Sequence, residues 1–127
     1  MAPSVVLVTG VSRWLGARLA RTLCDVPGIA RVVGVDASPP NPALRETLGR
    51  TEFVRADIRN PLIGKVIAAT GVDTVVHMNV QATPGDSGGR SAMKEINVIG
   101  TMQLLAACQR AATVRRLVVK STTAVYG

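Results

Sequence analysis

A short aliphatic run that ends in glycine constrains the fold of this chain more than any other feature. Residues 5–8 are all Val or Leu, and Gly10 follows one position after Thr9. A helical pattern then begins at about Trp14 and includes Gly16. A buried strand that stops at glycine and is followed by an amphipathic helix is typical of sheets that helices cover. The sequence therefore predicts a strand, a tight turn and a helix at its start.

This turn has the chemistry of a phosphate-binding site. Gly10 lets the chain leave the strand without a Cβ in the way, and Gly16 lets the helix lie close to the sheet. The free N–H groups at the start of a helix point toward an anion such as a pyrophosphate. Two glycines alone do not identify a cofactor, so the interpretation depends on the residue types at the ends of the other strands.

The remainder of the chain alternates apolar runs of strand length with helical patterns. Within the first helix, Leu15, Leu19 and Leu23 recur at a spacing of four, with Arg18 and Arg21 outside this stripe. Such alternation predicts an α/β fold, a doubly wound parallel sheet (Rossmann fold) of strand order 3-2-1-4-5, as one domain over residues 1–127. The further strands are expected at 31–36, 52–56, 74–78 and 117–121, and the helices at 14–25, 43–49, 61–69 (with Pro61 in its first turn) and 91–111.

The charge of the chain is basic but scattered. The formal net charge is +7, and only one basic pair, Arg115-Arg116, is adjacent in sequence. The chain has one Trp, one Tyr and one Phe, so no aromatic residues alternate with the basic ones to stack on bases. This distribution favours a solvated surface over a nucleic-acid partner.

Cysteine usage and hydropathy predict the compartment. Cys24 and Cys108 are far apart and form no CxxC motif, which favours buried free thiols in a reducing compartment. No signal-peptide pattern and no apolar run of membrane-spanning length occurs in the sequence. We therefore expect a cytoplasmic protein with no membrane partner and no metal site.

Ligand-facing residue types occur at the end of every predicted strand. Ligands of open α/β sheets bind outside the carboxyl ends of the strands, so these positions should converge. Asp36, at the end of the second strand, is suited to accept hydrogen bonds from both adenine-ribose hydroxyls. Its charge would repel a 2′-phosphate, which favours NAD over NADP. The other strand-end groups are Asp57-Ile58, His77-Met78-Asn79-Val80 and Ser121-Thr122.

Taken together, these stretches resemble the extended short-chain dehydrogenase/reductase family, the NAD-dependent epimerase/dehydratases. The similarity covers nearly the whole chain, and within the family it is greatest to UDP-glucose 4-epimerases. It implies an NAD-dependent enzyme that transfers hydride on a nucleotide sugar such as UDP-glucose or UDP-galactose, as a homodimer when full length. The matching stretches are Thr9-Gly10 with Gly16, Val35-Asp36, residues 55–59, residues 75–77, residues 97–101 and residues 121–127.

The resemblance also implies roles for individual residues. Trp14 and Leu15 would offer backbone N–H groups to the pyrophosphate, Asp57 would meet the adenine amino group, and the Ile58 backbone would lie alongside. Asn97 would brace the active-site end of the long helix. The cofactor-binding set is completed by Gly10, Arg13, Gly16, Asp36, Met78, Asn79, Val80 and Ser121, and Thr122 would hydrogen-bond the reacting substrate oxygen. His77 is expected to support the end of its strand by hydrogen bonding.

The chain departs from the family pattern in several places. Met78, Asn79 and Val80 replace small residues after His77, and Ala82 lies where sugar epimerases often have a basic group. Arg13 replaces a third glycine and is similar to an arginine that accompanies NADP in another short-chain branch, although Asp36 outweighs it. The family's catalytic Tyr-x-x-x-Lys does not occur here, because Tyr126 belongs to a Val-Tyr-Gly turn with no following Lys. A hydride-transfer site needs an acid/base, so we expect these 127 residues to form only the cofactor-binding half and to catalyse nothing themselves. A non-catalytic NAD-binding or sensing protein, and a 3β-hydroxysteroid- or flavonol-type reductase, are the alternatives.

Overall fold

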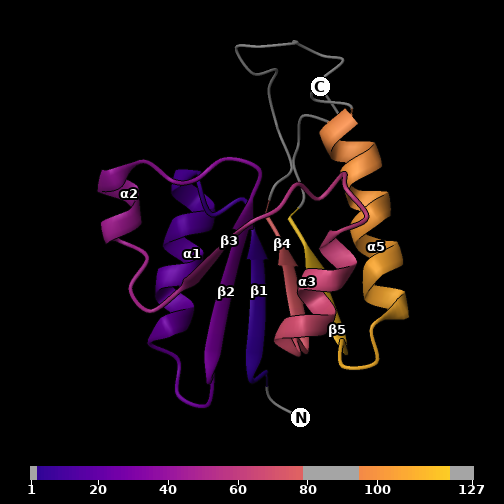
Figure 1. Ribbon diagram of the computed structural model, residues 1–127. Coiled ribbons are helices and arrows are strands. Elements are labelled where there is room, and N and C mark those ends of the chain that lie inside the picture. Colours follow the sequence, from indigo (N-terminus) through magenta and orange to yellow (C-terminus); the bar gives the residue numbers. More distant parts are fainter. Residues whose placement is uncertain (1–2, 79–94, 121–127) are drawn as a thin grey trace.

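Five parallel strands form the centre of the molecule, in the order β3-β2-β1-β4-β5 (Figure 1). The computed structural model describes residues 3–78 and 95–120. The strands are β1 (Val5–Thr9), β2 (Arg31–Asp36), β3 (Glu52–Arg55), β4 (Thr74–His77) and β5 (Arg116–Val119). The helices are α1 (Trp14–Cys24), α2 (Pro42–Glu46), α3 (Ile63–Thr70), the π-helix η1 (Glu95–Gly100) and α5 (Thr101–Arg110).

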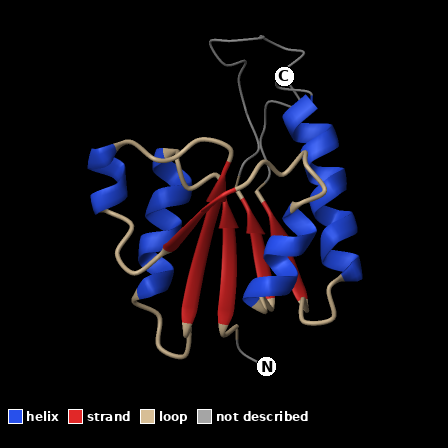
Figure 2. Cartoon of the chain, in the orientation of Figure 1, coloured by secondary structure: helices blue, strands red, loops and turns tan. Residues whose placement is uncertain are grey.

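Helices cover both faces of this sheet, in a doubly wound arrangement (Figure 2). On one face, α3 and α5 bury Ile63, Ile67 and Leu104 against the sheet. On the other face, α1 and α2 pack over β1, β2 and β3. The predicted fold class and strand order are therefore confirmed.

The ends of the helices differ slightly from the sequence prediction. Asn60 accepts a hydrogen bond from the Leu62 N–H, and the helix begins only at Ile63, so Pro61 lies in the turn before α3 and not in its first turn. Gly71 ends α3 in the left-handed conformation, at φ 66°, as expected. The fourth predicted helix is not regular throughout, because its described part begins as the π-helix η1 before α5.

The packing face of α1 is wider than the predicted leucine stripe, of which Leu19 and Leu23 pack half-buried against the core. Its buried residues are small, namely Gly16, Ala17, Ala20 and Cys24. The leucine stripe lies to one side of this face, and Leu15 is 45% exposed. A row of small residues lets the helix axis approach the sheet closely, and this close approach is what the glycine turn at its start requires.

No helix within residues 3–78 and 95–120 combines the length and the apolar character needed to cross a membrane.

Candidate functional site

The turn between β1 and α1 is built by a contact between its two glycines. Gly10 has φ 78°, and its N–H donates to the Val35 carbonyl at 2.9 Å. A Cβ on Gly16 would lie 2.1 Å from the Gly10 carbonyl oxygen, so only glycine fits at this position. Arg13 caps the helix with no side-chain hydrogen bond to it. The N–H groups of the first turn of α1 therefore face outward at the carboxyl end of the sheet.

Asp36 stands beside this turn, at the end of β2. Its carboxylate accepts a hydrogen bond from the Ser12 N–H at 3.1 Å and one from the Ala37 N–H at 2.8 Å. Burial raises the pKa of the Asp36 carboxyl, while the backbone N–H groups of Ser12, Ala37 and Ser38 and the Arg13 cation act in the opposite direction. The Ser12 hydroxyl donates to the Ser38 carbonyl and so ties the turn to the segment after β2. The structure thus places a carboxylate next to the open helix start.

Asp57 forms a local ion pair. Its carboxylate accepts from the Arg59 side chain at 2.7 Å and from the Arg59 backbone N–H at 2.9 Å. The Arg59 hydrogen bond lowers the pKa of Asp57, against the opposing effect of partial burial. A cavity of about 480 Å³ adjoins this carboxylate and is lined by residues of the ends of β2 and β3 and the start of α3, among them Ala37, Arg55 and Lys65.

The Ile58 side chain is buried and contacts η1. A Cβ on Gly100 would lie 2.7 Å from Ile58 Cδ1, so Ile58 occupies the space that a side chain at position 100 would need. Asn97 lies on the same π-helical turn and is half-buried. Single π-turns are frequent at functional sites. This contact joins the segment after β3 to the beginning of the long helix.

His77 joins β1, β4 and α5 at the carboxyl end of the sheet. Its Nδ1 lies 2.8 Å from Thr9 Oγ1 and its Nε2 lies 3.0 Å from Thr101 Oγ1. Thr9 Oγ1 also accepts from the Met78 N–H at 2.9 Å. Burial lowers the pKa of His77 from 6.5 to about 4, so the ring is neutral at pH 7 and serves as a hydrogen-bonding bridge. The support role expected for His77 is therefore what the geometry shows.

Sequence reasoning missed the two hydroxyl partners of His77. Thr9 and Thr101 both belong to the stretches that carry the family resemblance, but neither is a residue type that signals a site by itself. Their positions, directly before Gly10 and directly after Gly100, were the only available signal.

Ten predicted cofactor-binding residues lie within the described ranges. Six of them come from one turn and the strand beside it, and the rest come from neighbouring strand ends and from η1. The ten are Gly10, Arg13, Trp14, Leu15, Gly16, Asp36, Asp57, Ile58, Met78 and Asn97. Asn79, Val80, Ser121 and Thr122 lie outside the described residues, so their placement stays a prediction.

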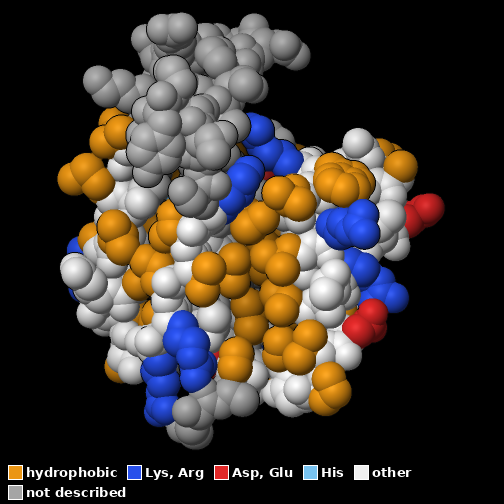
Figure 3. Space-filling view, turned by 180° about the vertical axis from the view of Figure 1, so that it is seen from behind, with side chains coloured by type: hydrophobic (Ala, Val, Ile, Leu, Met, Phe, Trp, Pro, Cys, Tyr) orange, Lys and Arg blue, Asp and Glu red, His pale blue; other side chains and the backbone are white. Residues whose placement is uncertain are grey.

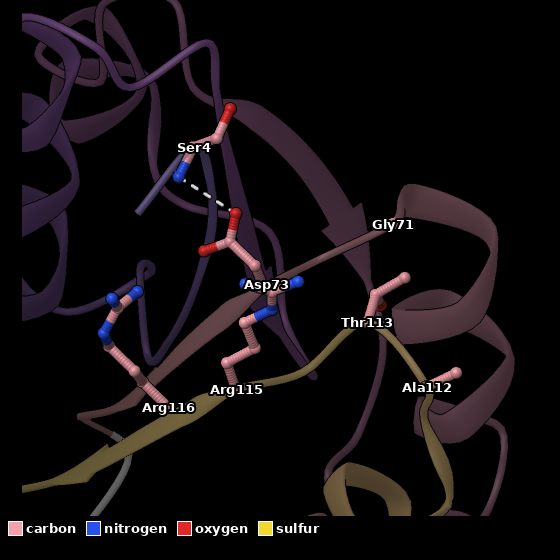
Figure 4. Close-up of a pocket in the computed structure, with 7 residues that line it drawn as sticks. All are labelled: Ser4, Gly71, Asp73, Ala112, Thr113, Arg115 and Arg116. Atoms are coloured by element: carbon pink, nitrogen blue, oxygen red, sulfur yellow. Dashed lines mark hydrogen bonds between the residues drawn. The ribbon is translucent and has the colours of Figure 1, made fainter. Parts of the chain in front are cut away.

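A second cavity, of about 330 Å³, lies at the opposite end of the sheet (Figure 4). Asp73 is central to it and accepts hydrogen bonds from the Ser4 and Val5 N–H groups, each at 2.9 Å. The Asp73 carbonyl accepts from the Arg115 N–H at 2.8 Å. The polar groups of Asp73 thus join the starts of β1, β4 and β5. Ligands of parallel sheets normally bind at the other end, outside the carboxyl ends of the strands. In residues 3–78 and 95–120, no group of three or more His, Cys, Asp or Glu is placed to hold a metal ion.

Comparison with known proteins identifies the family. A model of the NAD dependent epimerase/dehydratase family matches residues 6–127. The chain belongs to this family. An uncharacterized protein of Mycobacterium tuberculosis (strain H37Rv) is 55% identical over 125 residues, which cover 98% of this chain and 33% of that protein.

Solved epimerases share the fold. The UDP-glucuronic acid 4-epimerase of Bacillus cereus, in complex with UDP-4-deoxy-4-fluoro-glucuronic acid and NAD, superposes with a TM-score of 0.77 at 28% identity, covering 97% of this chain and 41% of that one. The UDP-glucose-4-epimerase of Stenotrophomonas maltophila, with bound NAD and formylated UDP-arabinopyranose, has a TM-score of 0.77 at 28% identity, covering 99% and 39%. The chain therefore spans about a third to two fifths of the length of these family members.

Proposed function

We propose that this chain is the NAD-binding part of an NAD-dependent epimerase/dehydratase that acts on a nucleotide sugar. The observation that carries the proposal is the Asp36 carboxylate held beside the open N-terminus of α1. One group is suited to ribose hydroxyls and the other to a pyrophosphate, and the two lie on the same turn.

The pyrophosphate would bind at the start of α1. The backbone N–H groups of Trp14 and Leu15 would donate to its oxygens, and the positive end of the helix dipole favours its charge. The contact between Gly10 and Gly16 supports this role, because it holds the helix start against the end of β1. The Arg13 guanidinium is exposed beside the same turn and would add a positive charge.

The adenosine would lie across the ends of β2 and β3. Ser12 and Ala37 each use one acceptor direction of the Asp36 carboxylate, which leaves others for the two ribose hydroxyls. The charge of Asp36 disfavours a 2′-phosphate, so NAD is preferred to NADP. Asp57 and the Ile58 backbone would contact the adenine, next to the cavity beside β3.

The remaining cofactor contacts would come from the strand ends nearer the centre of the sheet. Met78, Asn79 and Val80 would line the ribose and pyrophosphate, and Ser121 and Asn97 would complete the site. Bound NAD would supply a hydride acceptor. Thr122 would hold the reacting oxygen of the substrate, for which UDP-glucose or UDP-galactose is the proposed class because the solved relatives carry UDP-sugars.

Two further parts of the proposal concern the whole protein. Because these 127 residues contain no Tyr-x-x-x-Lys, we expect the chain alone to bind NAD without turnover. Exposed apolar side chains on η1 and α5, including Val98, Ile99 and Met102, support a homodimer through this helix. The buried free thiols of Cys24 and Cys108 support a cytoplasmic location.

A second candidate function is NAD binding without catalysis, and the Asp36 carboxylate beside the start of α1 supports it equally. A protein that kept the Asp36 site and lost the chemistry would bind or sense NAD without catalysis. An activity assay on the complete natural protein, with UDP-glucose and UDP-galactose, separates this function from the enzyme.

Calorimetry with NAD tests the binding site directly. We expect Asp36→Ala to weaken NAD binding by about tenfold to a hundredfold, because hydrogen bonds to a charged group contribute about 1.5–3 kcal/mol. The same variant should lose its preference for NAD over NADP. Asp25→Ala is the matched control, because it removes an exposed carboxylate at the other end of α1. NAD affinity unchanged in a folded Asp36→Ala protein would show that the site assignment is wrong.

A further inference from the structure

The cavity of about 330 Å³ at the amino ends of the strands contains two arginines that the proposed NAD site does not use. Arg115 and Arg116 line it together with Ser4, Asp73 and Thr113. Both arginine side chains extend from the start of β5 toward Asp73 and Ser4 (Figure 4). Figure 3 shows Lys and Arg side chains gathered at the lower end of the molecule, whereas the Asp and Glu side chains visible in that view lie mainly at its opposite edge.

The backbone holds both arginines at the cavity. The N–H groups of Arg115 and Arg116 both donate to the Asp73 carbonyl, at 2.8 and 3.2 Å. Neighbouring residues of a strand point to opposite faces of a sheet. Arg115, however, stands before β5 begins at Arg116, so the two side chains can line the same cavity. Because these bonds come from the main chain, they do not depend on the arginine side chains.

The Asp73 carboxylate is held mainly by neutral groups. Its Oδ2 accepts from the Ser4 and Val5 N–H groups, each at 2.9 Å, and its Oδ1 accepts from the Thr74 hydroxyl at 2.8 Å. Partial burial raises the pKa of Asp73, but these hydrogen bonds and the nearby Arg116 cation outweigh it, so the pKa is lowered and the group is ionised at neutral pH. Two cations and one anion leave the cavity with a net positive charge.

The two guanidinium groups keep their donors for a ligand. Within residues 3–78 and 95–120, neither Arg115 nor Arg116 forms an ion pair or a side-chain hydrogen bond. Other arginines donate to carboxylates or carbonyls of the protein, namely Arg21, Arg31, Arg50, Arg55 and Arg59. A guanidinium fork matches two oxygens of an oxyanion, and a phosphate group has three oxygens, so it can engage both forks at once, whereas one fork already saturates a carboxylate.

The cavity also has room for an organic group. Gly71 forms part of its wall at φ 66°, and a Cβ at this position would meet no atom within 4 Å. The volume of the cavity lies at the lower end of the range of about 300–1,000 Å³ that is typical of small-molecule sites. A phosphate group with a short organic body therefore fits better than a large nucleotide.

We propose that this cavity binds a small phosphate monoester, with its phosphate group between the guanidinium groups of Arg115 and Arg116 and its organic body against Gly71 and Thr113. The Ser4 hydroxyl would donate to the same phosphate group. The site lies at the opposite end of the sheet from the proposed NAD site, so the two ligands would not compete. This inference is independent of the cofactor assignment.

Amide chemical shifts test the proposal on this chain of 13.3 kDa. Glycerol 3-phosphate is titrated into the labelled protein at low salt, and inorganic phosphate is titrated in a parallel series. The N–H signals of Gly71 and Thr113 report on the cavity. The Leu15 N–H signal reports separately on the start of α1, where a phosphate group can also bind.

Three variants separate the site from the overall charge. Arg115→Gln and Arg116→Gln each remove one guanidinium, and Arg116→Lys keeps the charge without the fork. Arg110→Gln, at an exposed position at the end of α5, is the matched control for the loss of one positive charge.

We expect saturable shifts at Gly71 and Thr113, with the affinity about tenfold weaker in Arg115→Gln and in Arg116→Gln, as for the loss of charged hydrogen bonds. Arg116→Lys should fall between the wild type and Arg116→Gln, and Arg110→Gln should bind as the wild type does. Shifts that do not saturate, shifts confined to Leu15, or an equal loss in Arg110→Gln would overturn the proposal. So would inorganic phosphate binding at least as tightly as glycerol 3-phosphate, because the site would then take the free ion.

Discussion

Replacing Gly16 by alanine should disrupt the turn on which the proposed site depends. The new Cβ would lie 2.1 Å from the Gly10 carbonyl oxygen and 2.7 Å from its carbon. These are backbone atoms, and the Gly10 N–H is itself bonded to Val35 at 2.9 Å. No side-chain rotation can relieve the contact. An ordinary van der Waals contact begins at 3.4 Å, so α1 or the turn has to move by at least about 1.3 Å.

Two opposing effects set the size of the change. Alanine is favoured over glycine within a helix by about 1 kcal/mol. Overpacking a close contact costs about 1–3 kcal/mol, and more where the backbone must shift. The overlap at Gly16 involves only backbone, so the upper part of this range applies. We expect the free energy of unfolding to fall by about 2 kcal/mol, a loss that a domain with roughly 5–15 kcal/mol survives.

Urea denaturation of Gly16→Ala and Gly64→Ala provides the comparison. Gly64 also lies within a helix, but a Cβ there would meet only Ala107 Cβ at 3.8 Å, an ordinary contact. Gly64→Ala should therefore be stabilised by up to about 1 kcal/mol. If the free energy of unfolding changed by the same amount and in the same direction in both variants, the tight contact between Gly10 and Gly16 would not be the reason that glycine is necessary at position 16.

The other predictions concern the groups that join the strand ends. The neutral ring of His77 stabilises the fold above pH 6.5, and this contribution is lost as the pH falls toward about 4, because the unfolded chain binds the proton first. At about 1.4 kcal/mol per pH unit, the loss of unfolding free energy reaches up to about 3 kcal/mol. Urea titrations between pH 7 and 4 should show this loss in the wild type and not in His77→Gln. An equal dependence of the unfolding free energy on pH in the two proteins would contradict the prediction. Gly100→Ala should destabilise by about 1–2 kcal/mol through the contact with Ile58, and Ile58→Val, which removes the Cδ1 atom 2.7 Å from the new Cβ, should restore at least about half of this. An additive double-mutant cycle would show that the two positions act separately.

The order of the sheet could be predicted because it depends on regular patterns. Apolar runs of strand length alternate with helical segments along the whole chain, and right-handed crossovers leave few topologies for such an alternation. Residues at strand ends must then share one edge of the sheet. This is why Asp36 and Asp57 could be placed at the same edge from the sequence alone.

The packing of α1 could not be predicted in the same way. A spacing of four identifies a helical stripe, but it does not say which surface the stripe meets. The sequence places large leucines on one side of the helix and small residues such as Ala20 on another, and the usual expectation buries the larger ones. Here the close contact at Gly16 decides the orientation, because only the small side lets the helix approach the sheet. Leu19 and Leu23 then pack half-buried at the side of this core, and Leu15 is left 45% exposed.

The hydrogen-bond partners of Asp36 and Asp57 could not be predicted from the sequence either. These partners change what each carboxylate can contribute to the binding of a dinucleotide. Asp36 is held by two backbone N–H groups and keeps free acceptor directions. Asp57 is held by Arg59 in an ion pair whose side chains are 33% and 36% exposed. A partly exposed ion pair of this kind contributes about 0–1 kcal/mol to stability. Adenine can therefore displace Arg59 from Asp57 at a small free-energy cost, but its own contact with Asp57 adds little to the affinity for NAD. We therefore expect Asp57→Ala to weaken NAD binding by less than Asp36→Ala in the same calorimetric series. An equal or larger loss at Asp57 would mean that adenine, and not the ribose, anchors the adenosine.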